Sequence, residues 1–213
     1  MDRLQKFLTG VIFDFDGVIK ESLEIKTHGF LGLFPFADDT LKRRIKEHHE
    51  TNMGVSRFIK IPLYMNWAAE PITEQSVSTF TQKYSELVVR LVVDSDWVPG
   101  VQDFIKEAKR KSHLYVVSAT PRDELLEILT RLDLLEYFTL VFGSPKSKSD
   151  AVHDILIGHN FDRHRLLLIG DSMQDYLAAK KNGLKFILRR TKYNIEIQRY
   201  SDVTTIRDFQ EFL

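Results

Sequence analysis

Val11-Ile12-Phe13-Asp14-Phe15-Asp16-Gly17-Val18 is the stretch that decides the fold. Its apolar run ends in two carboxylates one residue apart, and a glycine that can turn the chain sharply follows at once. The pattern predicts a buried β-strand whose functional residues lie beyond its carboxyl end, where open α/β sheets place their ligands. Because neighbouring residues of an extended chain point to opposite faces, Asp14 and Asp16 are expected on the same side.

Two carboxylates crowded at a strand end repel each other unless a cation or a proton lies between them. Oxygen ligands at this spacing suit Mg²⁺, which accepts one or two carboxylates plus substrate phosphate and keeps several waters. An aspartate beside a metal can also act as a nucleophile towards phosphorus. The alternative is a solvated acidic turn, since Asp-Gly is common in turns. The octet alone leaves both interpretations open.

The composition is that of an ordinary soluble globular protein. Its 213 residues, 43% of them hydrophobic, can form one sizeable core and a smaller domain. Lysine plus arginine equals aspartate plus glutamate, so neither nucleic acid nor a membrane is expected as a partner. Local basic clusters such as Lys109-Arg110-Lys111 and Arg189-Arg190 are interpreted as solvated faces. The lack of cysteine excludes disulfides, thiolate metal sites and cysteine nucleophiles.

The start of the chain and its longer apolar segments do not have the patterns of targeting or membrane signals. Met1 to Leu8 mixes charges and lacks a long apolar region. No later segment approaches the roughly 18 apolar residues of a membrane span. A cytoplasmic location is therefore expected.

Residues 20–97 differ in character from the stretch before them, because apolar residues recur there at helical spacing and no alternating strand is present. We expect a small helical cap at 20–97, inserted into an α/β core formed by 1–19 and 98–213. The predicted helices are Leu23–Phe34, Leu41–His49, Val55–Trp67 and Val77–Val93, with breaks at Pro35, at Gly54, and at Pro62 or Pro71.

Strands and helices alternate after Pro99, which predicts an α/β core. The predicted strands are Leu114–Val117, Thr139–Phe142 and Leu166–Ile169, and the predicted helices include Val101–Arg110 and Asp150–His159. Each strand ends in polar residues. The carboxyl ends of these strands are therefore the expected site.

The first of these ends carries Ser118, Ala119 and Thr120. Pro121 suits the first turn of a following helix, which makes Thr120 the expected N-cap. Hydroxyl and amide groups beside a helix start bind phosphate well. The alternative is helix capping and nothing more.

Later strand ends supply lysines and further carboxylates. Lys146 and Lys148 lie in one polar loop, and Lys148 is preferred as a phosphate ligand because it stands at the helix entrance. Asp171 and Asp175 are one helical turn apart and can face the same point. In the alternative interpretation Asp171 caps the helix and Asp175 favours its dipole.

Taken together, these segments resemble the haloacid dehalogenase-like hydrolase superfamily, and within it the members with an inserted helical cap, similar to phosphoglycolate phosphatase and β-phosphoglucomutase. The resemblance implies a Rossmann-like parallel sheet. The matching motifs are Asp14-Phe15-Asp16-Gly17-Val18, Ser118, Lys148 and Gly170-Asp171-Ser172-Met173-Gln174-Asp175.

The resemblance also implies roles. Asp14 would attack phosphorus to give an aspartyl-phosphate, and Asp16 would protonate the leaving oxygen and later activate water. The residues expected to bind the phosphoryl oxygens are Ser118, Ala119 through its amide, and Lys148. The expected Mg²⁺ ligands are Asp14, the carbonyl of Asp16, and Asp171, with Asp175 close by.

The implied function is a Mg²⁺-dependent phosphatase acting on a small phosphorylated metabolite. One alternative is a sugar phosphate mutase similar to β-phosphoglucomutase, whose sequence the segment Gly54-Val55-Ser56-Arg57 resembles. Another is a non-catalytic binding or regulatory protein of the same fold. Dehalogenation is disfavoured because such enzymes lack the second acid, here Asp16.

The cap supplies three further candidates for substrate binding. Ser22 and Lys26 are four residues apart on the first cap helix, so they share a face that is expected to look towards the metal. Arg57 follows the glycine break and can reach an anion with its planar fork. The alternatives are a solvated Lys26 and an Arg57 paired with a surface carboxylate such as Glu50.

Overall fold

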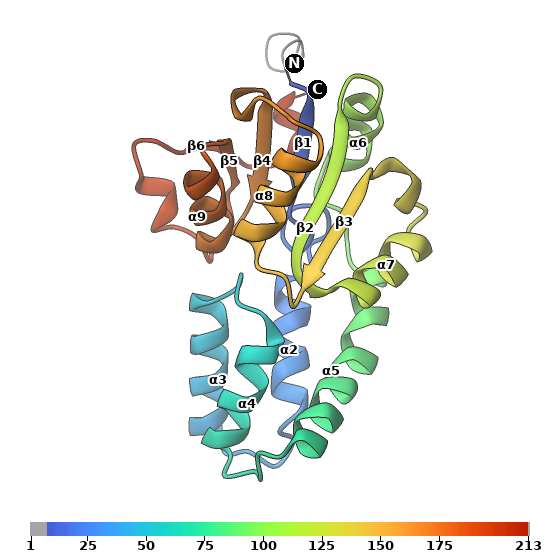
Figure 1. Ribbon diagram of the computed structural model, residues 1–213. Helices are drawn as coiled ribbons and strands as arrows, with labels where there is room; N and C mark the ends of the chain where they lie inside the picture. The colour runs from blue at the N-terminus through green and yellow to red at the C-terminus, as the bar shows by residue number, and fades with distance from the viewer. Residues whose placement is uncertain (1–7, 213) are drawn as a thin grey trace.

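The computed structural model describes residues 8–212, which form a sheet covered by helices on both faces and a separate group of helices at one end (Figure 1). The expectation for Met1 to Leu8 lies, apart from Leu8, outside the described residues. No helix within residues 8–212 has the length and hydropathy that crossing a membrane requires.

All neighbouring strands of the sheet are parallel, and their order is β3-β2-β1-β4-β5-β6. The predicted α/β class with a Rossmann-like parallel sheet is therefore confirmed. The strands are β1 (Gly10–Phe13), β2 (His113–Pro121), β3 (Leu140–Ser144), β4 (Leu166–Gly170), β5 (Lys185–Arg189) and β6 (Thr204–Ile206).

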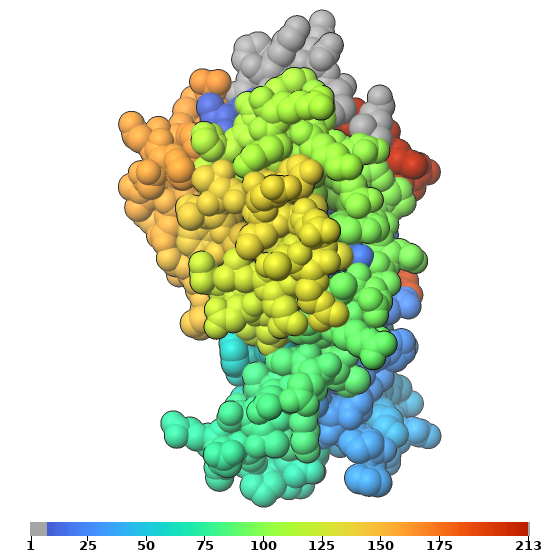
Figure 2. Space-filling model, turned by 90° about the vertical axis from the view of Figure 1, so that its right-hand side faces the viewer, coloured from blue at the N-terminus to red at the C-terminus, as the bar shows by residue number. Residues whose placement is uncertain are grey.

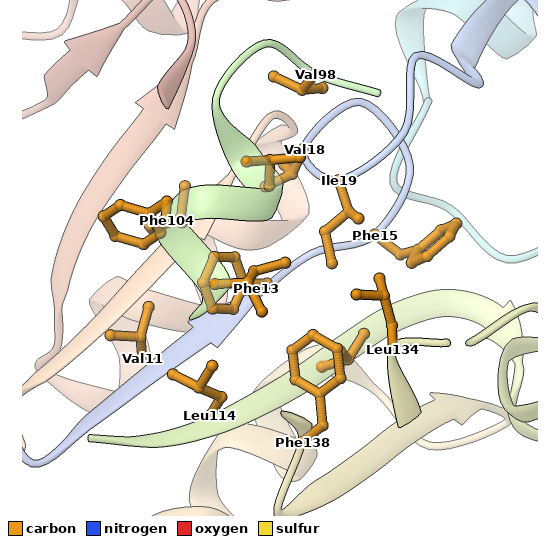
Figure 3. Close-up of a cluster of buried hydrophobic side chains, with 14 of the residues drawn as sticks. Val11, Phe13, Phe15, Val18, Ile19, Val98, Phe104, Leu114, Leu134 and Phe138 are labelled. Atoms are coloured by element: carbon orange, nitrogen blue, oxygen red, sulfur yellow. The ribbon is translucent and has the colours of Figure 1, made fainter. Parts of the chain in front are cut away.

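Strand β1 lies inside the sheet and is buried on both faces. Val11 and Phe13 pack on one face, and Ile12 on the other. Phe13 meets Phe104 and Phe138 edge-on, with ring centroids 5.9 and 6.1 Å apart (Figure 3). This packing fixes the end of β1, from which the two aspartates continue.

Helices cover the two faces of the sheet in pairs. Helices α6 (Val101–Lys109) and α7 (Arg122–Arg131) cover the face of Phe13, and α8 (Lys148–Gly158) and α9 (Met173–Asn182) cover the face of Ile12. The result is three layers, which is how α/β proteins bury a parallel sheet.

Helices α2 (Leu23–Gly32), α3 (Asp39–Thr51), α4 (Arg57–Trp67) and α5 (Glu74–Asp94) form the second body, which we call the cap (Figures 1 and 2). Its own apolar cluster includes Phe30, Tyr64 and Tyr84. Pro62 lies inside α4, so the break falls at Pro71 and not at Pro62. Buried neighbours such as Ile61 and Met65 hold the helix across this proline.

Three local expectations differ from the structure. Strand β2 continues through Ser118 to Pro121, so Thr120 belongs to the strand, and Pro121 is the N-cap of α7. Helix α8 begins at Lys148, two residues earlier than expected, because the Ser147 hydroxyl caps it by accepting from the Asp150 amide. Strands β5 and β6 were not predicted.

Candidate active site

The carboxyl ends of β1, β2 and β4 meet at one edge of the sheet. The chain passes from β1 to β2 on one side and later enters β4 on the other, so a crevice forms between these strand ends. Asp14, Ser118 and Asp171 lie there, and all three side chains are buried. The order of the strands thus gathers residues that lie far apart in the sequence.

An acidic cluster stands at this edge. Asp14, Asp171 and Asp175 each offer a carboxylate oxygen within 4.8 Å of the others. The Lys148 ammonium donates to Asp14 at 2.6 Å and to Asp175 at 2.7 Å. The cluster therefore contains three buried carboxylates and the positive charge of one lysine.

The crowding alters the acidity of the cluster. Burial and the charge of Asp175 raise the pKa of Asp14 to about 8 in spite of the contact with Lys148. Burial and the charges of Asp14 and Asp175 raise the pKa of Asp171 well above its usual value. A cation held by all three would favour their ionised forms, and their oxygens are ligands of hard divalent ions. The cluster can therefore hold a metal ion.

Gly17 permits the close packing of this site. Its φ of 77° lies in the left-handed region, and a Cβ atom there would lie 2.4 Å from Asp171 Oδ2. Only glycine combines this backbone conformation with this approach. The turn after Asp16 thus brings the first carboxylates against the end of β4.

Asp175 also stabilises the loop after β4. The N-cap of α9 is Ser172, whose hydroxyl accepts from the Asp175 amide, and Asp175 accepts from the Ser172 amide in return. Capping by Asp171, the alternative interpretation, is therefore wrong. Asp171 remains available to the cluster.

Asp16 points to a different set of partners. Its carboxylate accepts from Ser22 at 2.6 Å and from Thr120 at 3.0 Å, and it lies 2.9 Å from the Lys26 ammonium. Burial alone would raise the pKa of Asp16, but the charge of Lys26 and these hydrogen bonds outweigh it and lower the pKa. Asp16 is therefore an ionised carboxylate in this arrangement.

Ser22 and Lys26 do lie on the side of the cap that faces the sheet edge. Ser22 is the N-cap of α2 but makes no side-chain capping bond. Its hydroxyl donates to the Asp16 carboxylate instead. Lys26 also donates to the Thr120 hydroxyl at 2.8 Å. Both cap residues therefore contact the second aspartate and not the acidic cluster, and Thr120 joins them in place of its expected capping role.

The expected phosphate ligands Ser118 and Ala119 lie near the carboxyl end of β2, the strand beside β1. The Ser118 hydroxyl accepts from the Thr120 amide at 3.1 Å, and the Ala119 carbonyl accepts from Ser144 at 2.7 Å. The two lysines that follow β3, Lys146 and Lys148, differ in burial and in partners. Lys148 is 8% exposed and lies in the cluster, whereas Lys146 is exposed and pairs with Asp154. The geometry thus favours Lys148.

Arg57 connects the cap to the core. Its guanidinium lies 2.8 Å from the Glu124 carboxylate at the start of α7, donates to Ser85 at 3.0 Å and stacks on Tyr84. Pairing with Glu50, the alternative interpretation, is not observed. Arg57 also lines the cavity described below. Its role in substrate binding stays a prediction, and its contact with the core is an ion pair.

The ion pair of Arg57 predicts a change in stability. Arg57→Met should lower the free energy of unfolding by about 2–3 kcal/mol, because it leaves the largely buried Glu124 carboxylate without its cation. Adding Glu124→Gln should recover most of this loss. Urea unfolding of the two variants and the parent protein measures the effect. A double variant no more stable than Arg57→Met alone would show that the ion pair is not what Arg57 contributes.

Two supporting residues, Asn194 and Arg189, were not predicted from the sequence. Asn194 donates to the Asp171 carbonyl at 2.7 Å and to the Arg189 carbonyl at 2.8 Å. Arg189, expected on a solvated face, is 9% exposed and donates to Glu21 and to the Gly17 carbonyl. Both residues hold the loops that carry the carboxylates. No local pattern marks them, because their partners lie far away in the sequence.

Comparisons with known proteins show which family the chain resembles. The family model for haloacid dehalogenase-like hydrolases matches residues 11–189. A phosphorylated carbohydrates phosphatase from Thermotoga maritima is 28% identical over 189 residues, 84% of each chain. A phosphoglycolate phosphatase from Photorhabdus laumondii is 24% identical over 204 residues, 90% of this chain and 84% of that protein.

The solved structures point to the same fold. CbbY from Rhodobacter sphaeroides, solved in complex with phosphate, is similar with a TM-score of 0.78 and 21% identity over 96% of both chains. This likeness agrees with the parallel sheet and the inserted helices. Since the family model also covers most of the sequence, this chain belongs to the haloacid dehalogenase-like hydrolase family.

Proposed function

We propose that this protein is a Mg²⁺-dependent phosphomonoester phosphatase that acts on a small phosphorylated metabolite through an aspartyl-phosphate. The observation that carries the proposal is the buried Asp14 carboxylate, which contacts Lys148 and shares a cluster with Asp171 and Asp175 at the strand ends. The names of the relatives described above support phosphatase activity.

Asp14 is the proposed nucleophile. Its Oδ1 accepts from the Phe15 amide at 2.7 Å and its Oδ2 accepts from Lys148 at 2.6 Å, so the carboxylate has a fixed orientation. A carboxylate must be ionised to attack phosphorus. Mg²⁺ held by Asp14, Asp171, the Asp16 carbonyl and Asp175 would supply the charge that favours this form and would neutralise phosphoryl oxygens.

Asp16 is the proposed acid and base. Its ionised form suits the second half of the reaction, in which it takes a proton from the attacking water. In the first half it must carry a proton for the leaving oxygen, and the contact with Lys26 opposes this. We therefore expect Lys26 to leave Asp16 when an anionic substrate enters.

The transferred phosphoryl group would lie between the ends of β1 and β2. Ser118 and the Ala119 amide are proposed to donate to its oxygens, and Lys148 to offset their charge. Because phosphoryl transfer depends mainly on positioning and charge stabilisation, these groups supply most of what hydrolysis needs.

A cytoplasmic location, the lack of nucleic-acid and membrane partners, and the domain boundaries at 20–97 stay predictions.

The experiment is phosphate release from a generic aryl phosphate and from a panel of phosphorylated metabolites, each with Mg²⁺ and with EDTA. The expected result is release that requires the metal. Isomerisation of a sugar phosphate without net phosphate release would favour the mutase. No metal-dependent turnover of any compound would favour a non-catalytic protein.

A further inference from the structure

A small cavity of about 40 Å³ lies between the cap and the core. Its core side includes Asp16, Ala119 and Thr120, and its cap side includes basic residues from three helices: Lys26, His49, Arg57 and Lys60. Asp16 is the one carboxylate among the residues that line it. The wall opposite the proposed phosphoryl site is therefore strongly basic.

The basic residues differ in their partners. Lys26 pairs with Asp16, and Arg57 pairs with Glu124. Lys60 has no carboxylate within ion-pair distance among residues 8–212. Its ammonium is held instead by His49 Nδ1 at 2.9 Å, and the side chain is only 1% exposed. A buried ammonium without an opposite charge is unfavourable unless an anion comes to it.

His49 offers a second donor beside this ammonium. Because an ammonium group can only donate, Nδ1 accepts from charged Lys60, and the proton of the neutral ring is then on Nε2. Nε2 is buried and has no hydrogen-bond partner within the described part of the chain. Burial and the charge of Lys60 hold the pKa of His49 well below its usual value, so the ring stays neutral. The pair thus presents ammonium and imidazole N–H groups to one anion.

We propose that Lys60 and His49 bind a second anionic group of the substrate, a carboxylate or a second phosphate, a few atoms from the transferred phosphoryl group. The inference rests on the proposed function and names the substrate class for the same site. The cavity is small in this structure, so esters with short leaving groups are the first substrates to test.

The titration of Lys60 agrees with this role. Burial and the nearby charge of Lys26 lower the pKa of Lys60 to about 7. An anion bound at the ammonium favours its charged form. Besides Lys60 and Lys26, the titratable groups that line the cavity are His49, Tyr84, Arg57 and Asp16. Only Asp16 among them carries a negative charge near neutral pH.

The test compares esters with matched leaving groups: 2-phosphoglycolate, 2-hydroxyethyl phosphate and ethane-1,2-diol bisphosphate. The parent protein should show a kcat/KM at least about tenfold higher for an anionic ester than for the neutral one, as a charged hydrogen bond provides. Lys60→Met should reduce this ratio to near one, mainly through KM. Lys46→Met, which removes an exposed cap lysine, should keep it.

Two further measurements keep the test decisive. His49→Phe keeps an aromatic ring at this position and should also lower the ratio of kcat/KM between the anionic and the neutral ester. This variant therefore tests the anion site if Lys60→Met does not fold. Calorimetric binding of the same esters to Asp14→Asn, with and without Lys60→Met, reports the preference without turnover. Whichever anionic ester is preferred distinguishes a carboxylate site from a phosphate site.

The outcomes separate the two proposals. Hydrolysis of aryl phosphate without preference for an anionic ester would leave the phosphatase standing and overturn the anion site. A preference that survives both Lys60→Met and His49→Phe would also overturn it. Preferential binding to Asp14→Asn that Lys60→Met removes, without turnover by the parent protein, would support the anion site and contradict the phosphatase.

Discussion

Asp14→Asn is expected to lower phosphate release by roughly 10⁴-fold or more, since the amide is a poor nucleophile. It should also weaken Mg²⁺ binding by about tenfold or more, because one charge leaves a buried cluster. Phosphate release assays and calorimetric Mg²⁺ titration measure the two effects.

Asp16→Asn is the matched control for this variant. Its carboxylate faces Ser22, Thr120 and Lys26 and not the acidic cluster. Turnover should therefore fall, because the proposed acid and base is lost, while Mg²⁺ affinity stays within about threefold of the parent value. Equal loss of Mg²⁺ affinity in the two variants would contradict the roles proposed for the two aspartates.

Lys148→Ala is expected to lower kcat/KM by roughly 10²–10⁴-fold, and Lys146→Ala by no more than about threefold. The reason is position: Lys148 bridges Asp14 and Asp175, whereas Lys146 pairs with Asp154 on an exposed face. Steady-state kinetics with aryl phosphate at saturating Mg²⁺ measure both variants.

Stability must be followed in the same experiment. Removing Lys148 leaves buried carboxylates without their cation, which costs about 3–5 kcal/mol when no metal replaces it. Thermal unfolding with and without Mg²⁺ shows whether the variant is folded under assay conditions. A folded Lys148→Ala as active as Lys146→Ala would contradict the proposed role of Lys148 as a ligand of the phosphoryl group.

Much of the fold follows from local pattern. The apolar run that ends at Asp14 predicts β1, and similar runs before Ser118 and Asp171 predict β2 and β4. Parallel pairing then places their ends together. Strands β5 and β6 were not predicted, because neither is followed by a functional motif and β6 is only three residues long.

The partners of polar side chains could not be predicted in the same way. Periodicity tells which face of a helix is apolar, but not which distant group a buried polar residue meets. Lys60 and His49 lie on different helices and pair across the cap interior. Arg189 was predicted to be solvated because its basic neighbour resembles a surface cluster, yet Glu21, 168 residues away, binds it.

The contacts of Asn194 have a consequence for the order in which the site is completed. All motif residues precede residue 176, but the Asp171 carbonyl is held by an amide that comes later in the chain. On a ribosome, a nascent chain ending before residue 194 would already contain every proposed catalytic side chain and still lack this support. The proposed metal-binding loop is therefore completed only after all motif residues have been synthesised, and removing Asn194 should impair the site without touching a motif.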